Sequence, residues 1–479
     1  MPEPAPSGAA AGRLSPIGRG AWGWAIYEGA RNPWVLVGGI YVFAPYVATV
    51  VIGDPVEGQA QIADLNKWAG LIAAFVAPII GAAADRAGGR KAPLAIVTAI
   101  MASAMILCWF VQPGPLAGLW FPLLLTIGGL FGLNEALHNA MLQGAARPRD
   151  IPHVSGLGLA LGNAAGVVIL VFTLVFLAFP GNVDWPFVPA APAFGLDPAH
   201  YEPQRIAPVI CGLWFITFAI PLMLFTPDSA RGEPWSRAIR NGAGGVLATL
   251  RKLKTMGGVG RFLLARMFYA DAKTAIIVIG GVYVAGVMRW GLIEMTIYGL
   301  TLSFVAVFGG VVGATLDAAL GSKRAVLLEI ACVCFGLVGM VSIDRDTLFF
   351  QPMAPVRVWD APYFATAQEL ALLGMVCLLA VFITAAYASS RTLMTRLAPP
   401  HMAGELFGLY ALAGTATAWL GPLLVSVVTR ATQSQQIGFA SLGVLLAIGF
   451  AILAATPGPP TPADDAPAIG PAPSSRTVV

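Results

Sequence analysis

Twelve apolar stretches, each of roughly 20 residues and so long enough to cross a bilayer as a helix, limit the folds open to this chain. Of the 479 residues, 57% are hydrophobic and 11% are charged, whereas about 25% charged residues is usual in soluble proteins. We therefore predict an all-α membrane protein with twelve transmembrane helices. The predicted spans are 27–52, 68–84, 92–111, 119–143, 154–179, 206–226, 262–288, 292–316, 324–343, 367–391, 404–429 and 436–456.

The cysteine and histidine residues give no sign of a disulfide or a metal site. All five cysteines lie within apolar spans, where a free cysteine behaves as a small hydrophobic residue, and the four histidines lack ligand spacing. The sequence also lacks a nucleotide-binding GxxxxGK[ST] motif, so we do not expect this chain to use ATP as an energy source. We expect no cofactor, no enzyme activity and no nucleic-acid partner. The expected partners are the lipid bilayer, a small-molecule substrate and protons, and we expect a monomer.

The distribution of basic residues predicts the orientation in the membrane. If both termini are inside, 20 of the 28 Lys and Arg residues fall in inside segments and 6 fall in outside segments. Cytoplasmic loops carry such an excess of Lys and Arg. We therefore expect a multi-pass protein of the plasma membrane with both termini in the cytoplasm. Residues 1–20 lack an apolar core, so we expect no cleavable signal peptide.

The chain contains an internal repeat. Residues 27–41 (YEGARNPWVLVGGIY) recur at an offset of 242 as residues 269–283 (YADAKTAIIVIGGVY), with two tyrosines, a base and a Gly-Gly pair in register. Two further echoes pair 81–91 with 313–323 and 155–162 with 407–414. Parallel repeats of this kind are a transporter architecture, in which the binding site lies near mid-membrane where the halves meet.

The repeat and the composition together predict the domain organisation. We expect two six-helix bundles joined by a basic linker that is cytoplasmic and partly helical at the membrane surface. The two tails are rich in Pro and Ala with little to bury, which favours disorder. The predicted boundaries are 1–21 for the N-terminal tail, 22–226 and 261–456 for the bundles, 227–260 for the linker and 457–479 for the C-terminal tail.

The loop after the second span, residues 81–91 (GAAADRAGGRK), resembles the signature loop of the major facilitator superfamily, with a degenerate copy at 313–323. The other motifs resemble the branch of the autophagy-related vacuolar amino-acid effluxer. These motifs are WAIYE at 24–28, VSGLGLALG at 154–162, Tyr269-x-Asp271, Ser390-Arg391, FGLY at 407–410 and Gly421-Pro422. The resemblance covers residues 22–456 and implies two pseudo-symmetric bundles, alternating access and export of amino acids.

The resemblance also implies a gate in the two signature loops. Asp85 would meet the start of the eleventh span near Gly404, and Asp317 would meet the start of the fifth span near Val154. The alternative is that these loops are solvated turns whose basic residues only set the topology. The candidate gating residues are Gly81, Asp85, Arg86, Gly89, Arg90, Lys91, Asp317 and Lys323.

Ionisable residues at membrane depth form the candidate site, because each costs about 2.5–3.5 kcal/mol at a helix centre and therefore indicates function. Glu28 and Arg31, three residues apart, can pair on one helix face, and Glu135 can stack with His138 in the same way. The candidate substrate or proton-coupling residues are Tyr27, Glu28, Arg31, Glu135, His138, Asn139, Tyr269, Asp271, Lys273 and Arg391. Glu329 is a secondary candidate. The alternatives are snorkelling of long side chains, mutual pairing without a solute, and a topology-setting role for Arg391.

The signs of these charges predict the type of solute. Asp271, Glu28 and Glu135 would contact a proton or a substrate ammonium group. Arg31, Lys273 and Arg391 would face anionic groups, and a site with both signs suits a zwitterion. We therefore predict a secondary transporter that exports an amino acid or a similar zwitterion by alternating access, with proton coupling as a candidate drive. The alternatives are a sugar or drug transporter of the same fold, a non-transporting membrane sensor and a lipid-moving protein.

Overall fold

The computed structural model describes residues 18–147, 150–240, 257–397 and 403–457, without the side chains of Asp85 and a few other helical residues. Most of both predicted tails and residues 241–256 of the linker therefore lie outside the described residues. Twelve helical spans in the described part are long and apolar enough to cross a membrane, which confirms the predicted fold class.

The first half of the chain supplies six spans. They consist of α1 (Arg19–Pro33) with η1 (Trp34–Tyr41), α2 (Phe43–Tyr46) and η2 (Val47–Val51); α3 (Pro55–Ala87); α4 (Lys91–Leu107) with η3 (Cys108–Phe110); η4 (Ala117–Leu119) with α5 (Trp120–Ala140) and α6 (Leu142–Ala145); α7 (Ile151–Phe172) with η5 (Thr173–Ala178); and α8 (Glu202–Phe225). The short turns η6 (Ala193–Gly195) and η7 (Pro198–His200) lie in the loop before α8.

The second half supplies the other six spans. They are α10 (Gly257–Met288), α11 (Leu292–Leu320), α12 (Ser322–Val341), α13 (Ala367–Leu397), α14 (Ala403–Thr415) with α15 (Leu420–Thr432), and α16 (Gln435–Ala440) with α17 (Leu442–Ala454). The strands β1 (Thr347–Leu348) and β2 (Gln351–Pro352) form a small antiparallel hairpin in the loop before α13.

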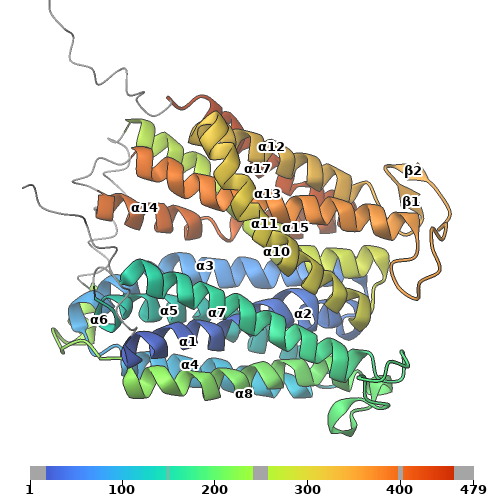
Figure 1. Ribbon diagram of the computed structural model, residues 1–479, viewed down its shortest axis with the longest axis horizontal. Coiled ribbons are helices and arrows are strands. Elements are labelled where there is room, and N and C mark those ends of the chain that lie inside the picture. The colour runs from blue at the N-terminus through green and yellow to red at the C-terminus, as the bar shows by residue number, and fades with distance from the viewer. Residues whose placement is uncertain (1–17, 148–149, 241–256, 398–402, 458–479) are drawn as a thin grey trace, which may run out of the picture.

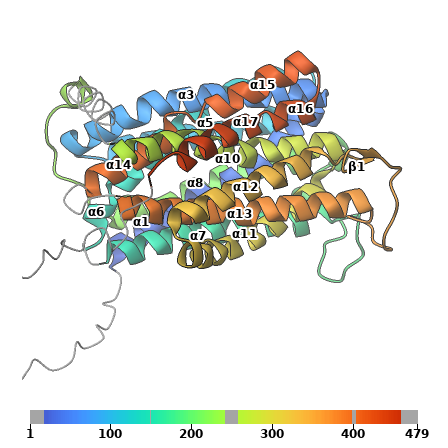
Figure 2. The ribbon, with the colours of Figure 1, turned by 90° about the horizontal axis from the view of Figure 1, so that it is seen from above.

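The two halves form two helix bundles that lie side by side (Figure 1). Helix α11 is tilted across the seam between them and contacts η1 and η5 of the first half. We call the end of the molecule that carries α6 and residues 226–240 the linker end. The opposite end, which carries residues 179–201 and 342–366, is the loop end (Figure 2).

Helix α3 begins earlier than the sequence interpretation placed it. That interpretation started the second span at residue 68, because residues 57–67 carry several acids and amides. In the structure the helix starts at Pro55, and the Asp54 side chain caps it by accepting a 2.8 Å hydrogen bond from the Glu57 N–H. The polar turns therefore belong to the span and are available to contact the other half.

The repeated Gly-Gly pair lets the first and seventh spans pack closely. A side chain at Gly38 would meet the ring of Trp34 in its own π-helical segment, and one at Gly281 would overlap the carbonyl oxygen of Ile40. Small residues allow such close backbone approach between membrane helices. The crossing of η1 and α10 thus fixes the seam next to the duplicated charged segments.

Candidate functional site

Glu28 and Arg31 of α1 form a cluster with His138 of α5. Arg31 donates from Nη2 to both oxygens of Glu28 at 2.8 Å. The Nδ1 atom of His138 lies 3.3 Å from Glu28 Oε2, and the His138 side chain is fully buried. Arg31 is 3% exposed and Glu28 is 22% exposed, so the carboxylate is the part of the cluster nearest to solvent.

Hydrogen bonds from neighbouring helices hold this cluster in place. The ring of His138 stacks on Trp24 with centroids 4.4 Å apart, and its Nε2 lies 2.9 Å from the Trp24 carbonyl oxygen. Because a carbonyl oxygen only accepts, His138 Nε2 carries the hydrogen. The Tyr27 hydroxyl lies 2.5 Å from Thr98 Oγ1 and accepts from Asn134 Nδ2 at 2.7 Å. Thr98 and Asn134 are functional-site candidates that sequence reasoning did not single out for contact with Tyr27.

The second half buries its own charged cluster around α10. The Tyr269 hydroxyl lies 2.9 Å from Ser390 Oγ. Lys273 is 1% exposed, and its Nζ lies 3.9 Å from the centroid of the Tyr387 ring. Glu329, which is fully buried on α12, accepts a 2.7 Å hydrogen bond from Ser389 Oγ through Oε1. Among the described residues, Glu329 Oε2 has no hydrogen-bond partner.

The two clusters are equivalent under the internal repeat. Arg31, which matches Lys273 in the alignment of the two segments, stacks over Phe131 of α5 at 4.9 Å. Lys273 stacks over Tyr387 of α13, the corresponding helix of the second half. Each half therefore places one buried cation against an aromatic ring on its fourth span.

The polar residues of the fourth span do not lie on one face. Asn134 and His138 are buried, whereas Glu135 and Asn139 are exposed. Successive residues of a helix lie about 100° apart, so these pairs form two adjacent rows rather than one. Glu135 therefore does not contact the His138 ring, although the i, i+3 spacing would allow such a contact. At an offset of 252, Glu135 matches Tyr387, and Asn139 matches Arg391, which is also exposed.

Asp271 lies apart from Lys273, although the two residues are only two positions apart. Its Oδ2 accepts a 2.8 Å hydrogen bond from the backbone N–H of Gly421, at the start of α15. Arg266 is engaged elsewhere, because it donates to the Tyr410 carbonyl oxygen at 2.6 Å and stacks over the ring of the same residue. The ten candidate residues thus divide into the α1–α5 cluster, the α10–α13 cluster, Asp271 at α15, and the exposed residues Glu135, Asn139 and Arg391.

The first signature loop contacts the linker. The carboxylate of Asp228 accepts from the backbone N–H of Arg90 at 2.8 Å, and Lys91 donates to the Met223 carbonyl oxygen at 2.9 Å. Gly89 has a positive φ of 58°, a backbone conformation that glycine adopts without strain. Arg86 is exposed, and no described residue lies within 4 Å of the position that a side chain at Gly81 would take. The predicted contact between Asp85 and Gly404 lies outside the described side chains.

The second signature loop makes its contacts within its own half. Asp317 accepts from Arg396 Nη2 at 2.9 Å, and Lys323 donates to the carbonyl oxygen of Ala454 at 3.0 Å. Asp317 therefore pairs with α13 in this structure, and its expected contact near Val154 stays a prediction.

At the loop end, α3 and α15 share an ion cluster that sequence reasoning missed. Arg430 lies 3.1 Å from Glu57 and 2.5 Å from Asp64. The Ser426 hydroxyl donates to Asp64 at 2.7 Å, and Lys67 lies 2.6 Å from the same carboxylate. We call these five residues the loop-end ion cluster. It was missed because residues 57–67 had been assigned to a loop, whereas they face the other half.

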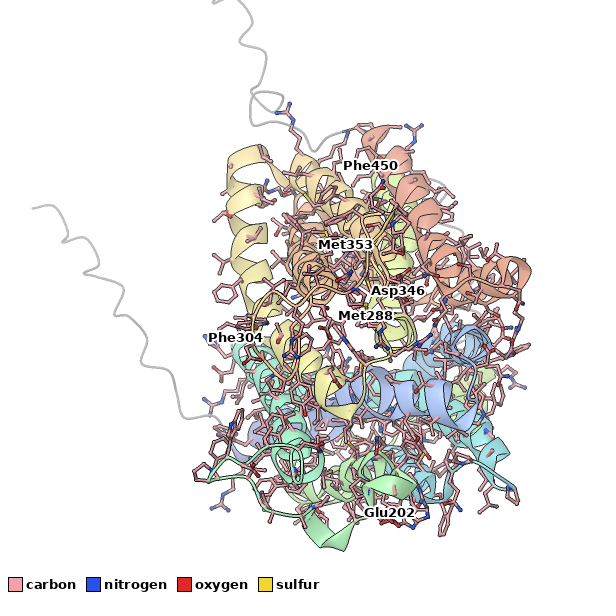
Figure 3. The ribbon with its side chains drawn as sticks, turned by 90° about the vertical axis from the view of Figure 1, so that its right-hand side faces the viewer. Glu202, Met288, Phe304, Asp346, Met353 and Phe450 are labelled. Atoms are coloured by element: carbon pink, nitrogen blue, oxygen red, sulfur yellow. The ribbon has the colours of Figure 1, made fainter. Side chains whose placement is uncertain are left out.

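A buried amide lies beside the loop-end ion cluster. Gln59, which is fully buried, donates from Nε2 to Thr429 Oγ1 and to the Gln435 carbonyl oxygen, each at 3.0 Å. A side chain at Gly286 of α10 would overlap the Gln435 amide, so α10 packs against this layer too. The two halves are therefore joined at the loop end by side chains of α3, α15 and α16. Figure 3 looks onto this end. Met288 lies between the long loop of the second half, which carries Asp346, and the first half, which carries Glu202.

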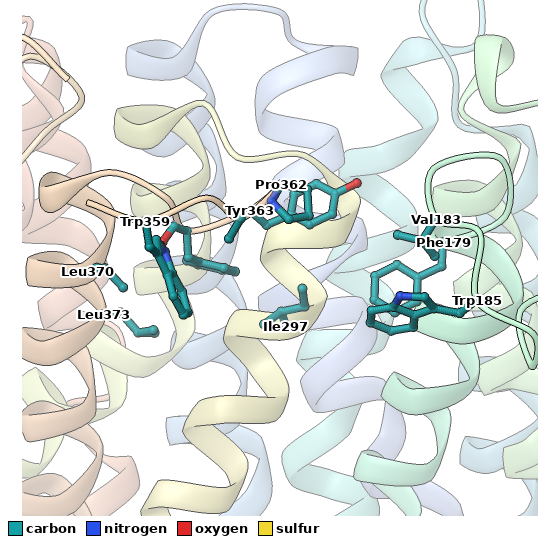
Figure 4. A pocket seen from close by; sticks show the side chains of 11 residues that line it. Phe179, Val183, Trp185, Ile297, Trp359, Pro362, Tyr363, Leu370 and Leu373 are labelled. Carbon is teal, nitrogen blue, oxygen red and sulfur yellow. The ribbon is translucent and has the colours of Figure 1, made fainter. Parts of the chain in front are cut away.

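A separate apolar pocket of about 380 Å³ lies between the halves at the loop end (Figure 4). Residues from α11, α13 and the two long loops line it, and five of the eleven are aromatic. They are Phe179, Val183, Trp185, Ile297, Trp359, Ala361, Pro362, Tyr363, Phe364, Leu370 and Leu373. None of these side chains carries a charge, so the pocket is not suited to hold a zwitterion.

Comparison with known proteins places the chain among transporters. The family model described as "Vacuole effluxer Atg22 like" matches residues 138–457. The "Uncharacterized MFS-type transporter YxiO" of Bacillus subtilis is 22% identical over 438 residues, covering 91% of this chain and 94% of that protein. Autophagy-related protein 22 of Yarrowia lipolytica is 22% identical over 325 residues, covering 61% of this chain and 48% of that protein. The chain thus spans about half the length of this fungal relative.

Solved structures agree on the fold. The nucleoside transporter NupG superposes with a TM-score of 0.61 at 12% identity, covering 91% of this chain and 98% of that one. A D-xylose-proton symporter superposes with a TM-score of 0.62 at 10% identity, covering 92% and 97%. The predicted resemblance is confirmed: the chain is an integral membrane transporter of the major facilitator type and belongs to the family of vacuole effluxer Atg22-like proteins.

Proposed function

We propose that this transporter moves an amino acid or a similar zwitterion, and that the two buried charged clusters bind it. The carboxylate of the solute would meet Arg31 and Lys273, and its ammonium group would meet Glu28 and Glu329. The presence of both charge signs in each cluster supports this choice, and the family's description as effluxers supports the movement of a solute across a membrane. Export from the cytoplasm across the plasma membrane is the direction and location that we propose.

The observation that supports the proposal most strongly is the pair of equivalent buried cations. Arg31 and Lys273 are 3% and 1% exposed, and each lies on an aromatic ring of the fourth span of its own half. Lys273 makes no hydrogen bond to another described residue, so its ammonium group is available to an anion. Buried charge at membrane depth is costly and is retained where it serves a solute.

Alternating access would follow from the way the halves meet. Side chains of α3, α15 and α16 join the halves at the loop end. The excess of basic residues supports a cytoplasmic linker end. Because the halves are joined at the opposite end, this structure would be the inward-facing state. Rocking of the bundles would break the loop-end contacts and bring the linker ends of α5 and α13 together. Glu135 and Arg391, which are exposed there and opposite in charge, would then approach each other.

The proposal is tested by uptake of radiolabelled amino acids into proteoliposomes, with and without a pH gradient. We expect saturable uptake of at least one amino acid and competition by its unlabelled form. Uptake of a sugar or a drug, with no amino acid taken up or competing, would refute the zwitterion and favour the other solute classes of this fold.

A further inference from the structure

Asp271 is a buried acid without a cationic partner among the described residues. Its side chain is 1% exposed, Oδ2 accepts the Gly421 N–H, and Oδ1 has no hydrogen-bond partner in the described part of the chain. The two buried bases of its own helix are engaged elsewhere, since Arg266 binds Tyr410 and Lys273 lies on Tyr387, and Arg261 is exposed at the start of the helix. A carboxylate in such surroundings is costly to keep ionised.

The group that Asp271 contacts is the first turn of a half-helix. The eleventh span is interrupted at residues 416–419, and α15 begins at Leu420 and runs for 13 residues. The N-terminus of a helix carries partial positive charge, which favours an anion at this position. Discontinuous helices that present such a terminus near mid-membrane are a recurring device of transporters.

The other end of α15 carries residues that join the two halves. Ser426 and Arg430 belong to the loop-end ion cluster, and Thr429 accepts from Gln59. One short helix therefore contacts Asp271 at its start and α3 of the opposite half at its end. A shift of α15 at Asp271 would therefore change its contacts with α3 at the loop end.

We propose that Asp271 is the binding site of the coupling proton and that α15 transmits its charge state to the loop end. Ionised Asp271 holds the start of α15 in the position seen here, with the loop end closed. Protonation removes the attraction between the carboxylate and the helix terminus, releases α15 and favours separation of α3 from α15. This proposal names the residue that would bind the proton in the transport cycle proposed above. It rests on that proposed function only for its biological meaning.

Other titratable groups also face this region and must be separated from Asp271. Glu57 and Asp64 of the loop-end ion cluster would also take up protons in acid and weaken their contacts with Arg430. A substitution that mimics protonation of Asp271 at constant pH avoids this ambiguity. Asp271→Asn keeps an oxygen that accepts from the Gly421 N–H but removes the charge.

The test measures the separation of the halves by electron paramagnetic resonance between spin labels at Leu116 and Thr432, both exposed near the loop end. The native cysteines are first replaced, and the full chain is held in lipid nanodiscs near neutral pH without solute. We expect Asp271→Asn to raise the population with the longer distance roughly three- to tenfold, the size of a helix-terminus charge interaction. The matched control is Glu329→Gln, which neutralises another buried acid of the same half that forms no hydrogen bond or ion pair with the described residues of α15, and it should leave the distances unchanged.

An unchanged distance distribution in Asp271→Asn, or an equal change in Glu329→Gln, would overturn the proposal. If Asp271→Asn does not fold, Asp271→Ser takes its place with the same readout, because serine also removes the charge and keeps an oxygen that can accept from the Gly421 N–H. A longer distance in Asp271→Ser then supports the proton site, and an unchanged distance refutes it. Because the readout needs no solute, a chain that moves no amino acid can still show this response, and failure of one proposal is separable from failure of the other.

Discussion

Burying the charge of Lys273 costs the fold more free energy than the contacts of its ammonium group return. It is 1% exposed, and its Nζ has aromatic rings of Tyr387 and Tyr269 nearby but no hydrogen-bond acceptor among the described residues. A buried charge of this kind is expensive unless a solute completes it. We therefore propose that Lys273 serves solute binding rather than stability.

We predict that Lys273→Met abolishes amino-acid transport and leaves thermal stability in detergent unchanged or improved. Methionine fills a similar volume without a buried charge, so the fold loses little. Transport is measured in proteoliposomes and unfolding by differential scanning fluorimetry. The control is Arg357→Gln, an exposed base of the long loop, which should change neither quantity. Full transport by Lys273→Met would exclude Lys273 from the site.

Arg31 differs from Lys273 because it neutralises Glu28 directly. We predict that Arg31→Gln destabilises the protein by about 2–3 kcal/mol, since it leaves a partly buried carboxylate without its counter-charge. Glu28→Gln in the same chain should recover most of that loss. Thermal unfolding of the single and double variants measures this, and equal loss in both would show that the pair does not account for the effect.

At the scale of elements, the structure shows why sequence reasoning was only partly successful. The i, i+3 spacing of Glu28 and Arg31 indicated that they could pair, because both lie on one helix. The contact of Glu28 with His138 could not be predicted, because it depends on how α1 and α5 are rotated against each other. The polar first turns of α3 were assigned to a loop, because apolar composition cannot mark a helix that buries polar groups against a partner helix.

We predict that these turns of α3 keep the loop end closed. Arg430→Gln removes the counter-charge of Glu57 and Asp64, and the two halves should separate more often. The measurement is alkylation of Val425→Cys, a fully buried position on α15, by a membrane-impermeant thiol reagent. The rate should rise severalfold in Arg430→Gln.

The matched control for that prediction is Val333→Cys on α12, which is also fully buried but lies within one half. Its alkylation should stay slow with and without Arg430. If both cysteines become reactive together, Arg430→Gln has loosened the whole fold rather than opened the loop end.

Across the whole molecule, the number of spans and their duplication could be predicted, because both depend on patterns within short stretches of sequence. Apolar length predicts a membrane helix, and the echo of residues 27–41 in 269–283 predicts two related halves. The seam between the halves is a different matter, because its contacts join residues hundreds of positions apart, such as Gln59 and Gln435. No periodicity within one segment reports on such a partner.

We propose that a zwitterion crosses the membrane between the two charged clusters. Solute counterflow is the sharpest test, because exchange of labelled for unlabelled solute needs no ion gradient. Proteoliposomes loaded with an unlabelled amino acid should accumulate the same labelled amino acid transiently, and those with Lys273→Met should not. If no amino acid shows counterflow with the native chain, or if Lys273→Met exchanges as fast as the native chain, the two clusters do not form a zwitterion site.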